Sequence, residues 1–486
     1  MNPFDFPRIL PRGGAVDPAY ARKGIRNRVV NLMFGAVAAG IVSAVATAGA
    51  QDESRHPAAT TIMLTTASPT AAQEKPQEVT APIGKQEVSA ASAERVNLDE
   101  LLREALDKNP AIKSAARRVL ALRARVPQAR SLPDPLVATN WMGNIIPYSV
   151  QQGDPSSYRG LTAMQEIPFP GKLRLRGQVA DREAEAAWWE YEKTRRQVVA
   201  DVKSAYYQYF YYRKALDITQ KNKDLLEKLA KIAEVQFKVG KGLQQDVLKA
   251  QVEVSRLLQR LTVFEQQERT ARVQLNTLLF REPEASLPPP APFEQARFTQ
   301  TLESLYELGR QNDTELQRAE RMIERGQYAV NLARKEYNPD FRVEYMYQQR
   351  PLMPDMHGVR FGINIPIFYQ TKQREGVIEA SEDLISARRS HDFRQTTVFF
   401  EVKENYLAAK AADDLARLYS RAIVPQSTLA LESSLAAYQV GKLDFLSMVT
   451  NFTTVLDYEL GYYEELSNFQ KALARLEVTT GVELTK

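Results

Sequence analysis

The sequence predicts a mainly α protein with a small β part, in which one plan of helix, β-hairpin, very long helix and shorter helix occurs twice. Two stretches, 171–239 and 371–439, contain almost nothing that would end a helix. Segments with alternating apolar and polar residues precede both stretches, and short motifs of the first half return in order in the second. Because internal repeats override estimates based on length, we expect two structural repeats in the 486 residues.

The first long stretch begins after the Pro168–Gly171 corner, and only Gly177 interrupts it before Gly240. At about 1.5 Å per residue this helix would be about 100 Å long, far beyond the usual 11–12 residues of a globular helix. Charged residues recur along it and exclude a membrane-spanning helix. The second stretch contains an interior proline, Pro425, and is expected to form one bent helix. Helices of this length need partners along their surface.

Composition and charge exclude several classes of function. Hydrophobic residues make up 44% and charged residues 25% of the chain, as in an ordinary folded protein. Residues 1–50 hold six basic and two acidic residues, which account for +4 of the net charge of +5, so the remainder is nearly neutral and no nucleic-acid partner is expected. There is no cysteine, and the three histidines are too scattered for a zinc site. Without phosphate-binding or metalloprotease motifs, we expect no enzyme, catalytic residue, cofactor or metal site.

Residues 1–50 have the pattern of an export signal. A basic region ends at Arg28, an apolar run extends from Val29 to Val42, and Ala48-Gly49-Ala50 offers a cleavage site. A retained transmembrane anchor is the alternative. Residues 51–92 are rich in Ala, Thr, Pro, Gln and Glu without periodicity, and we expect a disordered linker there.

The two repeats are predicted at 93–282 and 297–486, with a proline-rich linker at 283–296 between them. Asn97 and Asn109-Pro110 have the features of helix N-termini. The shorter second helix of the first repeat has apolar residues at heptad spacing, which indicates packing against another helix. In the first repeat we further predict a hairpin at about 136–168, a long helix at 171–239 and a helix at 243–281. In the second repeat we predict a hairpin at about 340–367, a long helix at 371–439 and a helix at 443–479.

Matching motifs lie at nearly constant offsets between the repeats. They are Ala129-Arg130 and Ala333-Arg334 (offset 204), Ile167-Pro168 and Ile365-Pro366 (offset 198), and Val239-Gly240-Lys241 and Val440-Gly441-Lys442 (offset 201). The small changes in offset are those that insertions in loops produce. The order of the matches indicates an internal duplication.

The hairpins have the alternation of outer-membrane strands, apolar on one face, polar on the other and aromatic at the edges. Polar residues expected to face a wet lumen include Glu166, Arg342, Glu344 and Arg360. A soluble sheet with one face in a core is the alternative. The residues predicted to face lipid are Phe341, Val343, Tyr345, Val359, Phe361, Ile363 and Ile365.

Four strands are too few for a closed barrel, since the smallest closed barrels have about eight. An open strand edge in lipid leaves backbone groups unpaired at a cost of several kcal/mol each. The chain is therefore expected to oligomerise. Two copies would supply eight strands, too narrow a barrel to conduct, and three would supply twelve.

These features resemble the TolC-type outer-membrane efflux proteins from about Asn97 to Leu484. The resemblance rests on the duplicated plan, the Ile167–Lys172 corner and the turns Phe237–Gly240 and Tyr438–Gly441. The corner, followed by Arg174 and Arg176, is most similar to the heavy-metal cation efflux branch. The resemblance implies a homotrimer whose 12-stranded transmembrane β-barrel lies in outer-membrane lipid and continues into a long periplasmic α-helical barrel.

The resemblance further implies the exit duct of a tripartite efflux system. Such a duct passively conducts heavy-metal cations or drugs from an inner-membrane pump, of the RND type, and a periplasmic adaptor protein to the outside. Two alternatives remain: a non-conducting coiled-coil scaffold of the cell envelope, and the duct of a type I protein secretion system.

The resemblance also assigns residues at the helix tips. Asp246 and Tyr438 would hold the periplasmic gate closed, although a helix-start aspartate and a packed tyrosine would look the same in the sequence. Leu443, Ser447 and Thr450 stand where well-known members have an arginine and two aspartates, so the resting gate is expected to be weaker or built differently. The residues implied to contact the adaptor are Val239, Gly240, Lys241, Gly242, Val440, Gly441, Lys442 and Leu443.

Two further clusters each allow two interpretations. The aromatic residues between Tyr206 and Tyr212 lie near the middle of the first long helix, where core packing and substrate stacking are the two readings. Met353, Met356 and His357 lie in the loop of the second hairpin, where a chance grouping and a contact to Cu(I) are the two readings.

Overall fold

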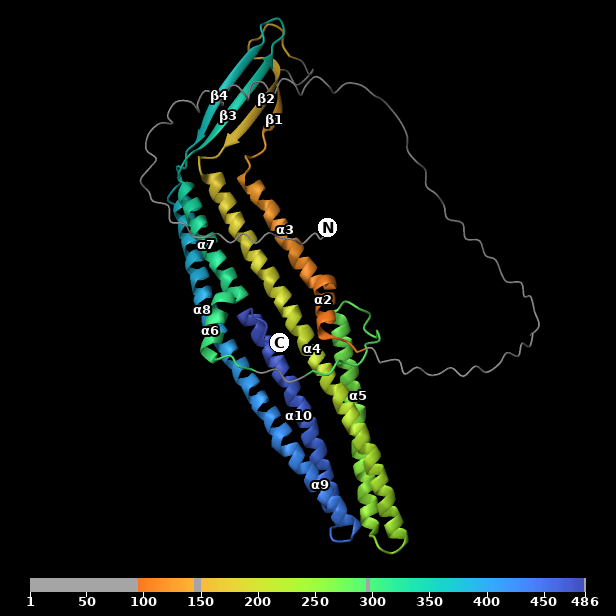
Figure 1. Cartoon of the computed structure of the whole chain (residues 1–486). Helices are drawn as coiled ribbons and strands as arrows, with labels where there is room; N and C mark the ends of the chain where they lie inside the picture. The colour runs from red at the N-terminus through yellow and green to blue at the C-terminus, as the bar shows by residue number, and fades with distance from the viewer. Residues whose placement is uncertain (1–94, 144–149, 294–297, 485–486) are drawn as a thin grey trace, which may run out of the picture. The chain divides into compact units, whose positions relative to one another are not determined.

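The computed structural model describes residues 95–143, 150–293 and 298–484 (Figure 1). The expected export signal and the expected linker at 51–92 lie outside these residues, as do the last three residues of the predicted proline-rich linker. Among the described helices, none has an apolar stretch long enough to cross a membrane.

The helices and strands follow one another in two series of the same order. The first series consists of α2 (Leu98–Lys108), α3 (Pro110–Arg130), β1 (Leu136–Met142), β2 (Tyr158–Ile167), α4 (Lys172–Lys238) and α5 (Gln244–Leu278). The second consists of α6 (Leu302–Asn312), α7 (Thr314–Lys335), β3 (Asp340–Gln349), β4 (Met356–Asn364), α8 (Gln373–Leu418), α9 (Val424–Gln439) and α10 (Phe445–Thr480). With 67 residues, α4 is about 100 Å long.

The second long helix is interrupted between α8 and α9. Tyr419–Ile423 form a π-helical turn that ends two residues before Pro425, and Pro425 occupies the first turn of α9. A proline has no amide hydrogen to donate and its ring crowds the preceding turn, so one wider turn lets the chain continue in helical form. At the position where a bend is expected, the structure has a local change of helix type.

The four strands form one antiparallel sheet in the order β1-β2-β3-β4. Its register places Phe341 beside Ile363, Val343 beside Phe361 and Tyr345 beside Val359. Since side chains at directly paired positions point to the same side, these residues share one face. The last strand ends at Asn364, so Ile365 lies just beyond it; Pro366 cannot donate a hydrogen bond to a ladder.

Two hydrophobic clusters, one in each repeat, contain matching residues. In the first repeat, α2, α3, α4 and α5 meet around residues that include Leu101, Ile112, Val198, Val202, Ala271 and Leu275. In the second repeat, α6, α7, α8 and α10 meet around their counterparts Leu305, Leu316, Val398, Val402, Ala472 and Leu476. Between counterparts, the residue numbers differ by 204 in α2 and α3 against α6 and α7, and by 200 in α4 against α8. They differ by 201 in α5 against α10. The duplication is therefore present in the packing as well as in the motifs.

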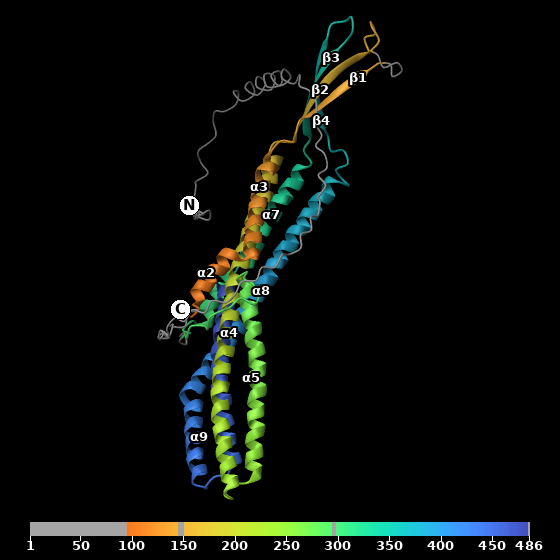
Figure 2. The same ribbon diagram turned by 90° about the vertical axis from the view of Figure 1, so that its right-hand side faces the viewer.

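A third cluster joins the two repeats. Buried residues of α4, α5, α9 and α10 pack together toward the turns that connect these helices, and the two views show the α4–α5 and α9–α10 pairs running to neighbouring turns (Figures 1 and 2). Helix α4 also packs against α3, α7 and α10 along its length. This arrangement brings the two tip turns close together.

The aromatic cluster near the middle of α4 is core. Tyr206 donates hydrogen bonds to the carbonyl oxygens of Val96 and Ala291, and Tyr209 donates one to the carbonyl of Leu287. Both tyrosines are almost fully buried. Their contacts tie the segment before α2 and the proline-rich segment after α5 to the long helix, which supports the packing interpretation of these aromatics.

Candidate functional site

One face of the sheet is an apolar band. Val359, Phe361 and Ile363 of β4 are 61%, 66% and 57% exposed, and their partners on β3 point to the same side. Within the described part of the chain nothing covers these side chains. Exposed aliphatic and aromatic residues in such continuous rows are unusual on a soluble sheet and are typical of strands that face lipid.

The opposite face carries paired polar groups. Arg360 of β4 forms an ion pair with Glu344 of β3, with 3.2 Å between the guanidinium and the carboxylate. Glu166 of β2 lies opposite Arg342 of β3 in the register. The amide of Asn140 donates to the hydroxyl of Thr162. Charges that alternate in sign across neighbouring strands leave this face hydrophilic with little net charge.

A buried lysine joins the sheet to the long helix. Lys172, the first residue of α4, is only 1% exposed; its Nζ lies 2.9 Å from Asp340 and 3.0 Å from Glu336, and donates to the carbonyl of Asn338. Asp340 also accepts the backbone N–H of Phe169. A cation at the N-terminus of a helix is disfavoured by the helix dipole, so its position in the sequence signals nearby carboxylates. In the sequence this residue stands out only as part of the Ile167–Lys172 corner.

The two tip turns have the same backbone geometry. Gly240 and Gly441 adopt φ of +74° and +73°, a region that favours glycine. The N–H of Lys241 bonds to the carbonyl of Gln236, and the N–H of Lys442 bonds to that of Ala437. These bonds close both long helices in the same way, by a left-handed residue after the last turn. Val239 and Val440 are 62% and 67% exposed, so each tip presents an apolar side chain.

The structure brings the two predicted gate residues near each other. Asp246 lies in the first turn of α5, and Tyr438, at the end of α9, is buried with its ring against that of Phe445. Burial and, secondly, the negative charge of Asp246 raise the pKa of the Tyr438 phenol above its ordinary value. Among the described residues no hydrogen bond joins the two side chains, so the Asp246 carboxylate acts on the neutral Tyr438 phenol only by making its ionisation less favourable.

The other predicted gate residues have local partners. Ser447 donates its backbone N–H and its hydroxyl to Asp444, which caps α10, and these bonds lower the pKa of the Asp444 carboxyl. Thr450 donates its hydroxyl to the carbonyl of Leu446 in its own helix. Leu443 packs against the cluster that joins the tips. None of these contacts of Leu443, Ser447 and Thr450 is an ion pair with a residue of α4 or α5.

A link between α5 and α10 was not foreseen from the sequence. The guanidinium of Arg260 lies 2.6 Å from the carboxylate of Asp457. The two helices meet only over a short stretch, because α10 packs chiefly against α4, α8 and α9. No sequence signal would have paired residues 197 positions apart.

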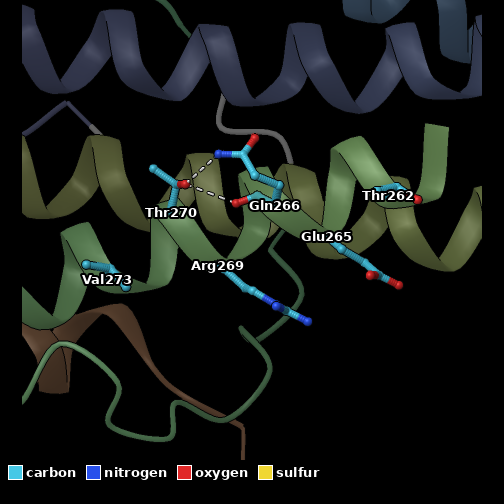
Figure 3. Close-up of a pocket in the computed structure, with 6 residues that line it drawn as sticks. All are labelled: Thr262, Glu265, Gln266, Arg269, Thr270 and Val273. Carbon is cyan, nitrogen blue, oxygen red and sulfur yellow. Dashed lines mark hydrogen bonds between the residues drawn. The ribbon is translucent and has the colours of Figure 1, made fainter. Parts of the chain in front are cut away.

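A shallow hollow lies on α5 about two turns beyond this link (Figure 3). Its residues all belong to one face of that helix, and Figure 3 shows Gln266 bonded to Thr270 while Glu265 and Arg269 extend away from them. Side chains of a single helix do not converge on a ligand, so we assign no site to it.

No site of histidine, aspartate and glutamate ligands is apparent in the part of the chain that the structure describes, where no three such side chains come together. In the second hairpin, Nδ1 of His357 lies 2.7 Å from the hydroxyl of Tyr345. The imidazole thus has a protein partner on the apolar face of the sheet. Met356 and His357 are the first residues of β4 and do not lie in the loop, as the sequence had suggested, because both pair with β3.

Comparison with known proteins places these features in a family. The sequence profile described as outer membrane efflux protein matches residues 101–279 and 305–482, one segment in each repeat and together more than half of the chain. The chain belongs to the outer membrane efflux protein family. In a direct sequence comparison no curated protein matches it.

Solved structures of outer membrane efflux proteins share the fold. VceC of Vibrio cholerae is 17% identical with a TM-score of 0.68, covering 80% of this chain and 96% of VceC. The CmeC channel of Campylobacter jejuni is 14% identical with a TM-score of 0.69, and the match covers 80% of this chain and 87% of CmeC. The open MtrE channel of Neisseria gonorrhoeae is 18% identical with a TM-score of 0.67, and the match covers 80% of this chain and 89% of MtrE. At such identities the likeness concerns the fold.

Family membership settles the general activity. Outer membrane efflux proteins are channels and not enzymes, with a part in the outer membrane and a helical part in the periplasm. They form trimers and work with periplasmic adaptors and inner-membrane pumps. The expectation of a TolC-type efflux channel is thereby confirmed.

Proposed function

We propose that this protein is the passive exit duct of a tripartite efflux system, formed by three copies whose sheets close into a 12-stranded barrel. The observation that carries the proposal is the sheet itself, which has an uncovered apolar face, a polar face of paired charges and two free edges, β1 and β4. Unpaired edges are not tolerated in lipid, so β4 of one copy must pair with β1 of another.

The same closure continues into the helices. Each strand is joined directly to one of α3, α4, α7 and α8, so three copies that close a barrel also arrange twelve helices around one axis. With α4 about 100 Å long, these helices and the pairs α4–α5 and α9–α10 form the periplasmic part of the duct.

The tips form the proposed contact with the adaptor. Each turn presents an exposed valine, a glycine with positive φ and a lysine whose N–H bonds to the carbonyl five residues earlier. Six such turns in a trimer would offer repeated apolar and basic positions to a ring of adaptor subunits. The residues proposed for this contact are Val239–Gly242 and Val440–Leu443.

The proposed gate lies at these same tips. Asp246 and Tyr438 are its main pair, and Ser447 and Thr450 occupy the α10 positions beside it. In the described part of the chain, Ser447 bonds to the capping residue Asp444 and Thr450 to Leu446 of its own helix, and Leu443 is uncharged. The resting closure of a single copy therefore depends on few polar contacts between helices. We therefore expect a gate that opens readily.

We propose heavy-metal cations or drugs as the cargo and an RND-type pump as the source of energy. Support for a metal cargo comes from the resemblance of the Ile167–Lys172 corner, followed by Arg174 and Arg176, to the heavy-metal branch. In the structure Lys172 and Arg176 both pair with Glu336. Complementation of a strain that lacks its own channel, with a metal pump or a drug pump supplied, distinguishes the two cargoes.

The decisive experiment is the mass and conductance of the purified mature protein. A trimeric particle in detergent that conducts ions in planar bilayers supports the duct, and a soluble monomer without a detergent belt contradicts it. A trimer that does not conduct under any condition, including after disruption of the gate, would favour the non-conducting scaffold. Export of a protein substrate in the complementation strain would favour the type I secretion duct.

A further inference from the structure

The polar face of the sheet contains methionines, and the apolar face contains none. Of the seven methionines in the described residues, four lie in the strands: Met142, Met164, Met346 and Met356. In the register of the sheet all four stand on the side of Glu344 and Arg360. A thioether side chain that served only to avoid water would be expected on the opposite, apolar face. The position of these methionines therefore calls for another explanation.

Three of these methionines form a diagonal row across neighbouring strands. Met164 of β2 lies directly opposite Glu344 of β3, two residues from Met346. Met346 in turn lies opposite Gly358 of β4, two residues from Met356. Residues in such diagonal positions are about 7–8 Å apart, a separation that long side chains bridge. Each neighbouring pair of thioethers in the row can therefore contact the same small ligand.

Small residues border the centre of the row. Met346 lies opposite Thr162 on one side and opposite Gly358 on the other. A methyl group on Gly358 would lie 3.2 Å from Cε of Met346, so this methionine extends over the glycine, onto the strand that also contains Met356. Met356 is 47% exposed, and Met164 and Met346 are half-buried. The row is therefore accessible to solvent on the polar face.

The charged neighbours of the row balance one another. Arg360, on the other diagonal of Met346, forms an ion pair with Glu344. Arg342 stands opposite Glu166 in the register. Because each guanidinium has a carboxylate beside it, the opposite charges largely cancel at the distance of the thioethers. The face therefore does not exclude a monovalent cation.

The register separates these methionines from the histidine that follows Met356. Consecutive residues of a strand point to opposite faces, and His357 lies on the apolar face, where its Nδ1 contacts the hydroxyl of Tyr345. The chain has no cysteine, so the ligands that the row offers are thioethers, without thiolate or imidazole. Hard cations such as Mg²⁺ and Ca²⁺ require oxygen ligands, whereas soft monovalent cations accept thioethers.

We propose that the diagonal row of Met164, Met346 and Met356 binds soft monovalent cations, Cu(I) or Ag(I), between neighbouring thioethers. The inference rests on the proposed function, because closure of the sheet is what places the polar face in the lumen. Met346 belongs to both pairs, so a bound ion passes from the first pair to the second without losing all its ligands. The row runs from near the helical end of β2 to the loop end of β4, along the path of exit (Figure 1).

Sites of this kind suit a passage better than a store. Conduction requires binding that is favourable enough for an ion to enter and weak enough for it to leave, over several sites. Two neutral thioethers bring no negative charge to the cation, so each pair holds it less firmly than thiolates would. Three copies of the chain would supply three such rows around the lumen. Met142, which is 52% exposed on β1, stands apart from the row and takes no part in it.

The test measures binding of Ag(I) to the purified oligomer by calorimetry, in nitrate buffer without chloride. Met164→Leu with Met346→Leu breaks both pairs while nearly conserving side-chain volume. The matched control is Met322→Leu with Met353→Leu, which removes two partly exposed thioethers from α7 and from the hairpin loop. The proposal predicts that the first variant binds Ag(I) at least about tenfold more weakly than the wild type, and that the control binds it equally well.

X-ray absorption at the silver edge identifies the ligands directly. Since the chain contains no cysteine, sulfur bound to the metal can come only from methionine. The proposal predicts sulfur neighbours of the metal in the wild type and in the control, and their loss in the Met164–Met346 double variant. A spectrum of the wild type with nitrogen or oxygen neighbours alone overturns the proposal.

Failure of the site and failure of the duct give different results. A conducting trimer that binds no Ag(I), or binds it equally in the double variant and the control, overturns the site and leaves the duct intact. A wild-type protein that is a non-conducting monomer contradicts the duct, and the site in the lumen falls with it. If the double variant does not assemble, Met356→Leu at the exposed start of β4 breaks one pair only. It should lower the number of Ag(I) ions bound per trimer, and an unchanged number overturns the proposal.

Discussion

Nζ of Lys172 lies 2.9 Å from Oδ1 of Asp340, and the lysine is 1% exposed whereas the aspartate is 20% exposed. These residues stand 168 positions apart and join the start of α4 to the start of β3. The same carboxylate accepts the N–H of Phe169, and the ammonium of Lys335 lies 5.3 Å from the centre of the Phe169 ring. The junction between sheet and helices is therefore stabilised by the buried ammonium of Lys172 and by the carboxylates that pair with it.

Replacement of this cation should destabilise the protein. In Lys172→Met, Asp340 and Glu336 lose their common partner, and breaking a buried ion pair from one side costs about 3 kcal/mol. We expect a lower denaturation midpoint for the purified protein in detergent. Lys372→Met is the matched control, because Lys372 is exposed near the start of α8. Equal midpoints for the two variants would show that the ion pair does not hold the junction.

Removal of the proposed gate pair should raise ion conductance. Asp246→Ala with Tyr438→Phe abolishes the charge and the hydroxyl while keeping most of the buried ring, so the helix packing around Phe445 is retained. Conductance of the purified protein in planar bilayers is the measurement. Glu234→Gln serves as control, since Glu234 pairs with Lys238 within α4 near the same tip. Unchanged conductance of the double variant would remove the gate assignment.

The contact between Arg260 and Asp457 should make a smaller contribution to closure. Both side chains are partly exposed, and such pairs are worth at most about 1 kcal/mol, or a fivefold change in the open fraction. Asp457→Arg is therefore expected to raise the open fraction modestly. Adding Arg260→Asp should restore the wild-type value, because the pair is re-formed with exchanged charges. If the doubly exchanged protein is as open as the single variant, the two residues do not act as a pair.

Alkaline pH should loosen the middle of α4. Burial raises the pKa of the Tyr206 phenol from 10.0 to about 12, and burial also raises the pKa of Tyr207 and Tyr211. A phenol whose pKa is raised in the folded state contributes stability that is fully present below pH 10 and is lost as pH rises toward 12. Denaturation midpoints measured between pH 9 and pH 12 should therefore fall.

The variant Tyr206→Phe isolates one of these phenols. It loses the hydrogen bonds to Val96 and Ala291 at neutral pH, but its stability should fall less steeply above pH 10 than that of the wild type. Tyr337→Phe is the control, because Tyr337 is 40% exposed. A pH dependence of Tyr206→Phe identical to that of the wild type would contradict the raised pKa.

Part of the site could be predicted from the sequence because local patterns encode it. The strand alternation around Val343 and Phe361 needs only a period of two residues. The tip turns could be located because Gly240 and Gly441 follow long stretches without a helix breaker. The partners of Ser447 and Thr450 could not, since a hydroxyl can bond within its own helix or across to another one. Likewise Arg260 gave no sign of meeting Asp457.

By itself, the sequence determined that two very long helices exist, that the plan is duplicated and that membrane-type strands accompany each copy. These properties depend on periodicity, on the positions of glycine and proline, and on offsets, all of which are local or can be counted along the chain. Only the tertiary structure decided that Lys172 is buried against Asp340 and that Asp246 lies near Tyr438. Such contacts join residues far apart in the chain, and they follow from the packing of whole helices, which no local pattern specifies.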